Sequence, residues 1–299
     1  MSNFDILFQA PVLSVQLLLD GILIGAVYAL AAYGMALCWG VMNIVNICQG
    51  EYVILGGYVA FYVIHWGGHP ALGVPAAAIV LYAVGWLIYR AVIWRVVDKD
   101  LFISILATYG IAILLQQLMN EVFGADIRSA ESGLGTWSLL GGDVTVAQIK
   151  VVAFVTTGII AVLIVWFLKS TRPGQAIRAT AQNARAARIV GIDTDKVYAN
   201  TYALNAAICG ASGALVAMTW IIHPFIGIPY TIRSFMIVVV AGVGNIAGVI
   251  VAALGLGALE QFAGFLLGVE FQLGFVFALL VAILLWRNLR LRRERRVLR

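Results

Sequence analysis

The sequence has very little charge. Asp, Glu, Lys and Arg make up 11% of its 299 residues, whereas soluble domains carry about 25%. Hydrophobic residues reach 63%, and the mean hydropathy is +0.99. So little polar surface cannot cover so much apolar surface in water, which excludes a soluble enzyme, a nucleic-acid binder and a disordered chain. The composition predicts an all-α polytopic membrane protein, with about eight to ten transmembrane helices at ~20 residues each.

The sequence also lacks the motifs of catalysis and of metal binding. Its three cysteines, Cys38, Cys48 and Cys209, are odd in number and form no CxxC pair, so neither a disulfide framework nor a metal site is predicted. It contains no HExxH motif, no Ser-His-Asp set and no phosphate-binding loop, so we expect no enzyme and no ATP hydrolysis by this chain alone. Without a basic n-region or an A-x-A site at the N-terminus, the first apolar helix is expected to serve as an uncleaved insertion signal.

Apolar segments fill most of the chain, and no domain boundary is visible. We therefore predict a single transmembrane domain over residues 1–286, followed by a basic cytoplasmic tail, 287–299. The seventh segment is short for a full span, and some segments are expected to be broken or re-entrant. The nine segments are approximately 12–40, 50–66, 72–94, 101–122, 148–168, 197–222, 229–243, 246–268 and 271–286.

Basic residues are concentrated in a few places, which predicts the orientation of the chain. Six of them lie in the loop 169–196, and seven Arg lie in the tail. The loop 123–147 contains only Arg128. By the positive-inside rule, the first two regions lie inside and the third outside. If all nine segments cross, the N-terminus lies outside, but a re-entrant early segment would reverse that parity.

The sequence of the inside loop predicts a helix within it. Residues 175–190 are rich in Ala and Arg and contain no helix breaker, and Gly191 suits the position that follows a helix end. Arg178, Arg185 and Arg188 fall on one face at helical spacing, opposite a face of small residues that includes Ala186 and Ala187. Two interpretations remain open at this point. The helix either lies on an anionic membrane surface or docks into a partner protein.

Polar residues are also clustered inside the apolar segments. Asn43, Asn46, Gln49 and Glu51 occupy nine residues with several glycines around them. Such a break is typical of a discontinuous helix at a substrate pathway, and a hydrogen-bonded contact between helices is an equal alternative. For Asn205, which lies among Ala and Gly, packing is favoured over a cavity wall.

Three charged residues in the spans have no assignable partner in the sequence. Asp20 and Glu260 are further candidates for the pathway or for a proton relay. Arg233 is expected to lie near the outer membrane boundary and to extend its side chain towards water.

Three motifs in order resemble the permease subunits of ABC importers for branched-chain amino acids and related small solutes. The family's Asn-Phe-Ala-His-Gly-Glu-like motif corresponds to Asn-Ile-Cys-Gln-Gly-Glu at 46–51. Its loop segment corresponds to Gly-Gln-Ala-Ile-Arg-Ala at 174–179 and Ala-Ala-Arg-Ile-Val-Gly-Ile-Asp at 186–193, and its Gly-rich stretch to Ala-Gly-Val-Gly-Asn-Ile-Ala-Gly at 241–248. Gln49, Arg185, Ala241 and Asn245 depart from the family pattern, which leaves the solute open.

The resemblance implies a non-catalytic permease of the branched-chain amino acid/ribose type in a bacterial inner membrane. The implied partners are a second related permease, two cytoplasmic ATPase subunits that carry ATP and Mg, a periplasmic solute-binding protein and membrane lipid. The default solutes are branched-chain or other small amino acids, with urea, amides and small carboxylates as alternatives. The resemblance favours a substrate pathway at Asn43, Asn46, Gln49, Glu51 and Asn205. It assigns coupling to the ATPase to Arg178, Thr180, Asn183, Arg185, Ala186, Ala187, Arg188 and Gly191.

Two further classes of protein were weighed against the importer. A stand-alone secondary transporter or channel would use Asp20, Glu51 and Glu260 as an ionisable relay, but it leaves the Ala- and Arg-rich loop unexplained. A membrane enzyme is disfavoured because no catalytic constellation is present.

Overall fold

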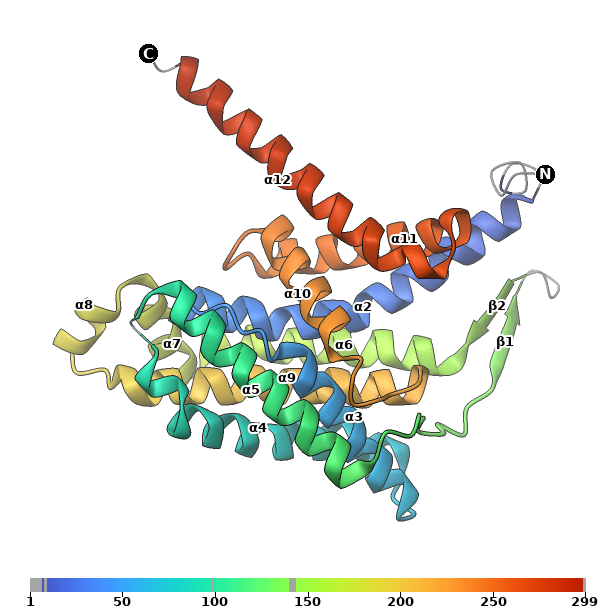
Figure 1. Ribbon diagram of the computed structural model, residues 1–299, viewed down its shortest axis with the longest axis horizontal. Helices are drawn as coiled ribbons and strands as arrows, with labels where there is room; N and C mark the ends of the chain where they lie inside the picture. The colour runs from blue at the N-terminus through green and yellow to red at the C-terminus, as the bar shows by residue number, and fades with distance from the viewer. Residues whose placement is uncertain (1–6, 8–9, 98, 140–143, 298–299) are drawn as a thin grey trace.

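The computed structural model describes residues 7, 10–97, 99–139 and 144–297, and over these it is almost entirely helical (Figure 1). Each of the nine predicted apolar segments forms a helix. Seven helical stretches are long and apolar enough to cross a membrane among the described residues, and the shorter α3 and α10 complete the set. The nine helices are α2 (Pro11–Met42), α3 (Gln49–His65), α4 (Gly73–Ala91), α5 (Leu101–Phe123), α6 (Gln148–Ser170), α9 (Thr194–Thr219), α10 (Gly227–Ala241), α11 (Ile246–Leu267) and α12 (Gln272–Val297).

Short elements connect the long helices. A 3₁₀ turn precedes α4 at Pro70–Leu72, and another follows α4 at Ile93–Arg95. A third, Val269–Phe271, precedes α12. Strands β1 (Thr136–Leu139) and β2 (Val144–Ala147) pair antiparallel within the predicted outside loop. Two short helices, α7 (Arg172–Gln182) and α8 (Ala184–Ile189), occupy the predicted inside loop.

The two predicted sides of the membrane lie at opposite ends of the molecule. The β-hairpin and the N-terminus share one end, whereas α7, α8 and the C-terminus lie towards the other (Figure 1). The backbone of the basic tail continues α12 as far as Val297, and residues 298 and 299 lie outside the described residues, as do most tail side chains. This segregation agrees with the distribution of basic residues in the sequence.

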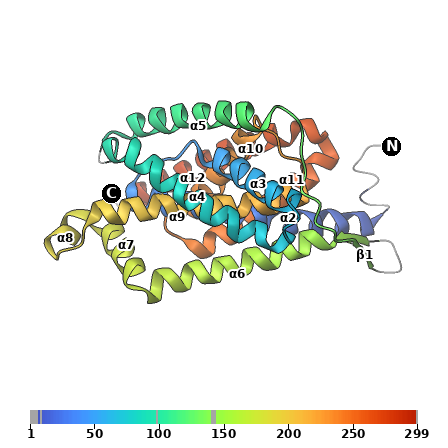
Figure 2. The same ribbon diagram turned by 90° about the horizontal axis from the view of Figure 1, so that it is seen from below.

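Helix α9 forms the centre of the packing. In its apolar 18-residue stretch, 94% of the residues are buried. In the corresponding stretches of α4, α5, α6 and α12, 28% or fewer are buried. Figure 2 shows α5 and α6 along opposite edges of the molecule, with α4, α3 and α9 between them. We therefore expect α5, α6 and α12 to present most of their surface to lipid or to other subunits.

Glycine explains how α9 packs so closely. A Cβ added at Gly213 would lie 1.8 Å from the Val53 carbonyl oxygen, and one at Gly56 would lie 2.4 Å from the Cα of Gly210. Only glycine fits such backbone-to-backbone contact between α3 and α9, which is how membrane helices associate where lipid removes the hydrophobic driving force.

Candidate functional site

The first site lies where the chain re-enters the bundle between α2 and α3. Asn43 ends α2 in the left-handed conformation, with φ of 53°. Residues 44–48 then run without helical structure to the start of α3. A non-helical backbone at membrane depth needs partners for its polar groups. Here the hydroxyl of Thr108 accepts a hydrogen bond from the Ile47 N–H at 3.2 Å, and that of Thr231 donates to the Ile47 carbonyl at 3.0 Å.

Two helices begin at this re-entrant segment. Thr231 of α10 also accepts a hydrogen bond from the Gly50 N–H at 2.8 Å. A Cβ on Gly50 would lie 1.8 Å from the carbonyl oxygen of Gly227, so the first turns of α3 and α10 are in direct backbone contact. Helices with 17 and 15 residues thus meet at their N-termini, which carry partial positive charge.

Glu51 lies between these two helix N-termini. It belongs to the first turn of α3, and its carboxylate lies over the Cα of Gly227, where an added Cβ would be 2.3 Å from Oε1. Its side chain is only 3% exposed, and Oε2 has no hydrogen-bond partner among the described residues. A carboxylate oxygen without a hydrogen-bond partner among the described residues thus lies at the junction of the two helix N-termini.

The other predicted pathway residues are divided between interior and surface. Asn46, Gln49 and Asn205 are fully buried, whereas Asn43 is exposed. Gln49 Nε2 donates to the Ala31 carbonyl at 2.7 Å and to Cys209 Sγ at 2.8 Å, and Cys209 Sγ in turn lies 3.6 Å from Asn205 Oδ1. The structure thus joins Gln49 and Asn205 through Cys209, whereas Asn46 Oδ1 accepts hydrogen bonds from the Cys48 N–H and the Tyr202 hydroxyl.

A second polar cluster was missed by sequence reasoning. Arg233 of α10 forms a bidentate ion pair with Glu260 of α11, with Nε 3.0 Å from each carboxylate oxygen and a further hydrogen bond from the guanidinium group. The Arg233 guanidinium lies 5.0 Å from the ring centre of Tyr28 and 5.9 Å from that of Tyr230. The side chains are 13% and 5% exposed, so the expectation that Arg233 extends towards water was wrong.

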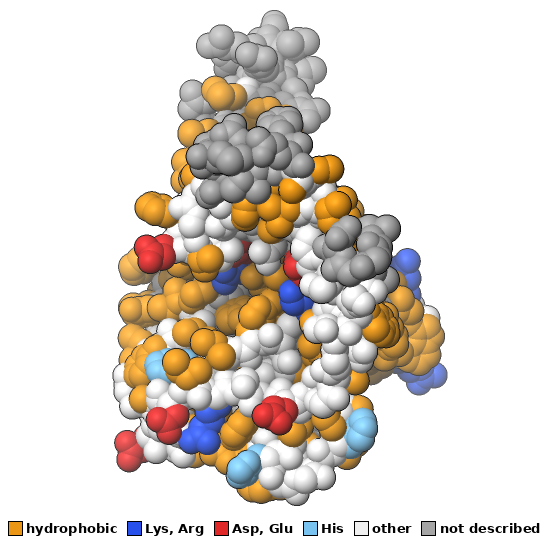
Figure 3. Space-filling view, turned by 90° about the vertical axis from the view of Figure 1, so that its right-hand side faces the viewer, with side chains coloured by type: hydrophobic (Ala, Val, Ile, Leu, Met, Phe, Trp, Pro, Cys, Tyr) orange, Lys and Arg blue, Asp and Glu red, His pale blue; other side chains and the backbone are white. Residues whose placement is uncertain are grey.

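Asp20 also has a partner that the sequence did not reveal. Lys150 Nζ lies 2.6 Å from the Asp20 carboxylate. Figure 3 looks onto the end of the molecule that carries the hairpin, where basic and acidic side chains lie beside one another within a mostly hydrophobic face. Both Asp20 and Glu260 thus have an oppositely charged partner within the chain.

The inside loop forms the third site, and it differs from the single predicted helix. Asn183 adopts extended angles, φ of −160° and ψ of 98°, and separates α7 from α8. Its Oδ1 accepts a hydrogen bond from the Ala186 N–H at 3.0 Å, which caps α8. The Arg residues of the loop therefore do not share one continuous helical face.

The end of α8 is confirmed at the predicted residue. Gly191 has φ of +88°, and the N–H groups of Gly191 and Ile192 donate to the carbonyls of Arg188 and Ala187. This is a Schellman motif, which glycine permits at the left-handed position.

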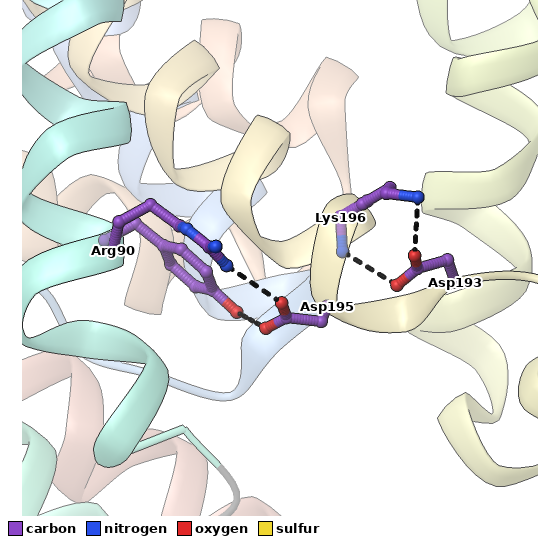
Figure 4. A network of polar contacts seen from close by, with 5 residues as sticks. Arg90, Asp193, Asp195 and Lys196 are labelled. Atoms are coloured by element: carbon purple, nitrogen blue, oxygen red, sulfur yellow. Dashed lines mark hydrogen bonds and ion pairs between the residues drawn. The ribbon is translucent and has the colours of Figure 1, made fainter.

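The start of α9 anchors the loop on the bundle (Figure 4). Asp193 caps α9 by accepting from the Lys196 N–H at 3.2 Å, and the hydrogen bonding by Lys196 holds the pKa of Asp193 below its usual range. Asp195 accepts from the Tyr89 hydroxyl at 2.7 Å and pairs with Arg90 of α4 at 3.4 Å. The start of α9, where the loop returns to the bundle, is thus tied to α4.

The predicted coupling residues are not equally accessible. Thr180 and Ala187 are 2% and 3% exposed, so their side chains pack within this chain. The other six are exposed: Arg178, Asn183, Arg185, Ala186, Arg188 and Gly191. Ile189 and Val190, at the tip, expose 82% and 75% of their surface, and Ile189 was missed because nothing in its local sequence sets it apart from the buried apolar residues.

Comparison with known sequences decides the family. Residues 17–284 match the family described as the branched-chain amino acid transport system permease component. The chain belongs to this permease family. The permease is 28% identical over 285 residues to the high-affinity branched-chain amino acid transport system permease protein LivH of Salmonella typhimurium, covering 90% of this chain and 92% of that protein.

Other relatives extend across bacteria and archaea. The permease protein BraD of Pseudomonas aeruginosa is 28% identical over 288 residues, or 91% of this chain and 93% of its own. A probable branched-chain amino acid transport permease protein LivH of Methanocaldococcus jannaschii is 27% identical over 271 residues, which cover 87% of this chain and 85% of that protein. No solved structure matches the permease. The predicted resemblance and the multi-pass, all-α membrane fold are therefore confirmed.

Proposed function

We propose that this permease is the transmembrane subunit of an ATP-driven, binding-protein-dependent importer in a bacterial inner membrane. Its solutes are branched-chain or other small amino acids, as the names of its relatives suggest. It forms the translocation pathway with a second related permease and is non-catalytic, with ATP and Mg bound by two cytoplasmic ATPase subunits. A periplasmic solute-binding protein delivers the solute to the end that carries the hairpin.

The tip of the inside loop carries this proposal. Ile189 and Val190 are apolar and largely exposed, and they end α8, which lies at the opposite end of the molecule from the hairpin (Figure 1). The caps at Asn183 and Gly191 and the ion pair of Asp195 hold this tip in place. An exposed apolar projection flanked by basic residues is more stable in a pocket on a partner protein than in water. ATPase closure, through different contacts with the tip in two states, would then bias the permease between outward and inward access.

The re-entrant segment supports the proposed pathway. Transporters commonly place their solute where discontinuous helices meet near mid-membrane, and α3 and α10 meet at Gly50 and Gly227. The Oε2 atom of Glu51 has no hydrogen-bond partner among the described residues at that junction. We propose that the solute passes this junction when the two permease subunits move apart, with Asn43, Asn46, Gln49, Glu51 and Asn205 around it.

Gentle purification of the tagged permease from its native host tests the assembly. We expect an ATPase and a second permease to purify with it. The variant Ile189→Asp places a charge at the tip and should reduce recovery of the ATPase about tenfold or more, as expected for loss of one buried interface anchor, while the second permease is retained. Gln175→Asp, an exposed change in α7, is the control and should recover both partners. A lone permease that transports solute without partners would contradict the proposal.

A further inference from the structure

A cavity at the inside end of the bundle has no role in the proposed function. It has a volume of about 310 Å³ and lies between the C-terminal half of α2, the end of α6 and helix α7. Its walls are apolar, with Leu37, Val41, Ile164, Val165 and Leu168 among them. Gly244, in the turn between α10 and α11, closes one side.

Two cationic side chains lie in the lining of this cavity. Lys169 and Arg178 both line it. Among the described residues neither Lys169 nor Arg178 forms an ion pair, and the Arg178 guanidinium donates a hydrogen bond of 3.4 Å to the Lys169 carbonyl oxygen. From residue 148 to residue 192 the sequence contains six basic residues and no Asp or Glu. Nothing within this stretch neutralises the two charges, so this part of the lining favours an anion.

The surface beside the cavity is apolar and exposed. On α6, the side chains of Val162, Leu163 and Trp166 are 68%, 54% and 59% exposed, and they lie within one turn of cavity residues Ile164 and Val165. Trp166 precedes Lys169 by less than one helical turn, and this pairing of an aromatic and a basic residue is typical of the membrane–water boundary. An apolar groove that opens at this depth is accessible to an acyl chain, whereas a small water-soluble anion would leave the apolar walls unfilled.

We infer that this groove binds an anionic phospholipid of the cytoplasmic leaflet. Its phosphate group lies between Lys169 and Arg178, and one acyl chain lies along Leu37, Ile164 and Val165. Basic pockets between transmembrane helices on the cytoplasmic side are suited to such head groups. The lipid joins α2, α6 and α7, so it supports the first helix of the inside loop. Arg178 therefore serves the lipid, and the exposed tip of α8 alone serves the ATPase.

Native mass spectrometry tests this site. It would measure how much phosphatidylglycerol stays bound to the permease after purification in detergent, together with any subunits that purify with it. The wild type should retain phosphatidylglycerol and release phosphatidylcholine. The double variant Lys169→Gln/Arg178→Gln should lower retained phosphatidylglycerol about tenfold or more, since each basic residue contributes to head-group binding. The matched control Arg185→Gln/Lys196→Gln removes two inside charges away from the groove and should retain the lipid as the wild type does.

A second variant separates a lipid from a free phosphate. Val165→Trp fills the apolar groove and leaves both cations, and it should reduce phosphatidylglycerol retention as strongly as loss of the charges. Retention unchanged by either variant, equal retention of phosphatidylcholine, or displacement of the lipid by an excess of inorganic phosphate would overturn the inference. The lipid site is tested by lipid retention and the proposed function by recovery of the ATPase. A negative result for the lipid site can therefore be told apart from a negative result for the proposed function.

Discussion

At the residue scale, polar groups inside the spans are organised by pairing across the chain. The sequence revealed Asn46, Gln49 and Glu51 because charged and amide groups are rare in apolar segments. It did not reveal Thr108 and Thr231, which hydrogen-bond the re-entrant backbone, because isolated threonines are common in membrane helices. The partners of Asp20 and Glu260 were equally hidden. Lys150 lies 130 residues from Asp20, and Arg233 lies 27 residues from Glu260, so only the tertiary packing shows these pairs.

The Arg233–Glu260 pair has a clear energetic meaning. Removing one member of a buried ion pair leaves an uncompensated charge, which costs about 3–5 kcal/mol. Tyr28 and Tyr230 add cation–π contacts to the guanidinium. The pair therefore fixes α10, one of the two short helices, against α11.

Glu51→Gln tests the proposed pathway at the scale of one residue. The change keeps the size of the side chain and removes its charge. Because a hydrogen bond to a charged group contributes about 1.5–3 kcal/mol, uptake of radiolabelled leucine by cells should fall about tenfold to a hundredfold while the amount of permease in the membrane is unchanged. Asn46→Ala should also lower uptake.

Gly255→Ala supplies the control, since a Cβ there would meet nothing within 4 Å. Wild-type uptake by both Glu51→Gln and Asn46→Ala would assign the cluster to helix packing alone.

At the element scale, the sequence predicted where helices occur better than where they break. Every predicted apolar segment is a helix, because runs of apolar residues this long have few other stable structures in a membrane. The predicted end at Gly191 is confirmed, because the left-handed conformation there has a strong residue preference. The single helix over residues 175–190 was wrong. Ala and Arg favour helix on both sides of Asn183, but Asn183 caps the second helix instead of continuing the first.

Asn183→Ala tests whether this break sets the position of the loop tip. Loss of the cap should cost about 1 kcal/mol and favour one continuous helix, which would move Ile189 and Val190. In the purified assembly we expect more ATP hydrolysed per solute transported. Asn183→Asp supplies a carboxylate oxygen that can accept the same hydrogen bond from the Ala186 N–H, and it should behave as the wild type. Identical ratios for the alanine and aspartate variants would show that the break has no part in coupling.

At the scale of the whole molecule, the distribution of charge predicts the orientation, and the packing of glycine shapes the bundle. The basic loop and the tail lie towards one end and the hairpin at the other (Figure 1), as counting basic residues predicted. The meeting of α3 and α10 could not be predicted, because Gly50 and Gly227 come together only when α9 and its neighbours are in place. Charged residues are few in this chain, and among the described residues five ion pairs hold ten of them.

ATP-dependent uptake by the reconstituted assembly is the most direct test of the central claim. The permease and its co-purified partners would be placed in vesicles of lipid extract, and the entry of radiolabelled leucine would be measured with the solute-binding protein present. The account predicts uptake that requires ATP and the binding protein and that Ile189→Asp lowers about tenfold or more, in line with loss of an interface anchor. Uptake that continues without ATP, or uptake that Ile189→Asp leaves unchanged, would contradict it.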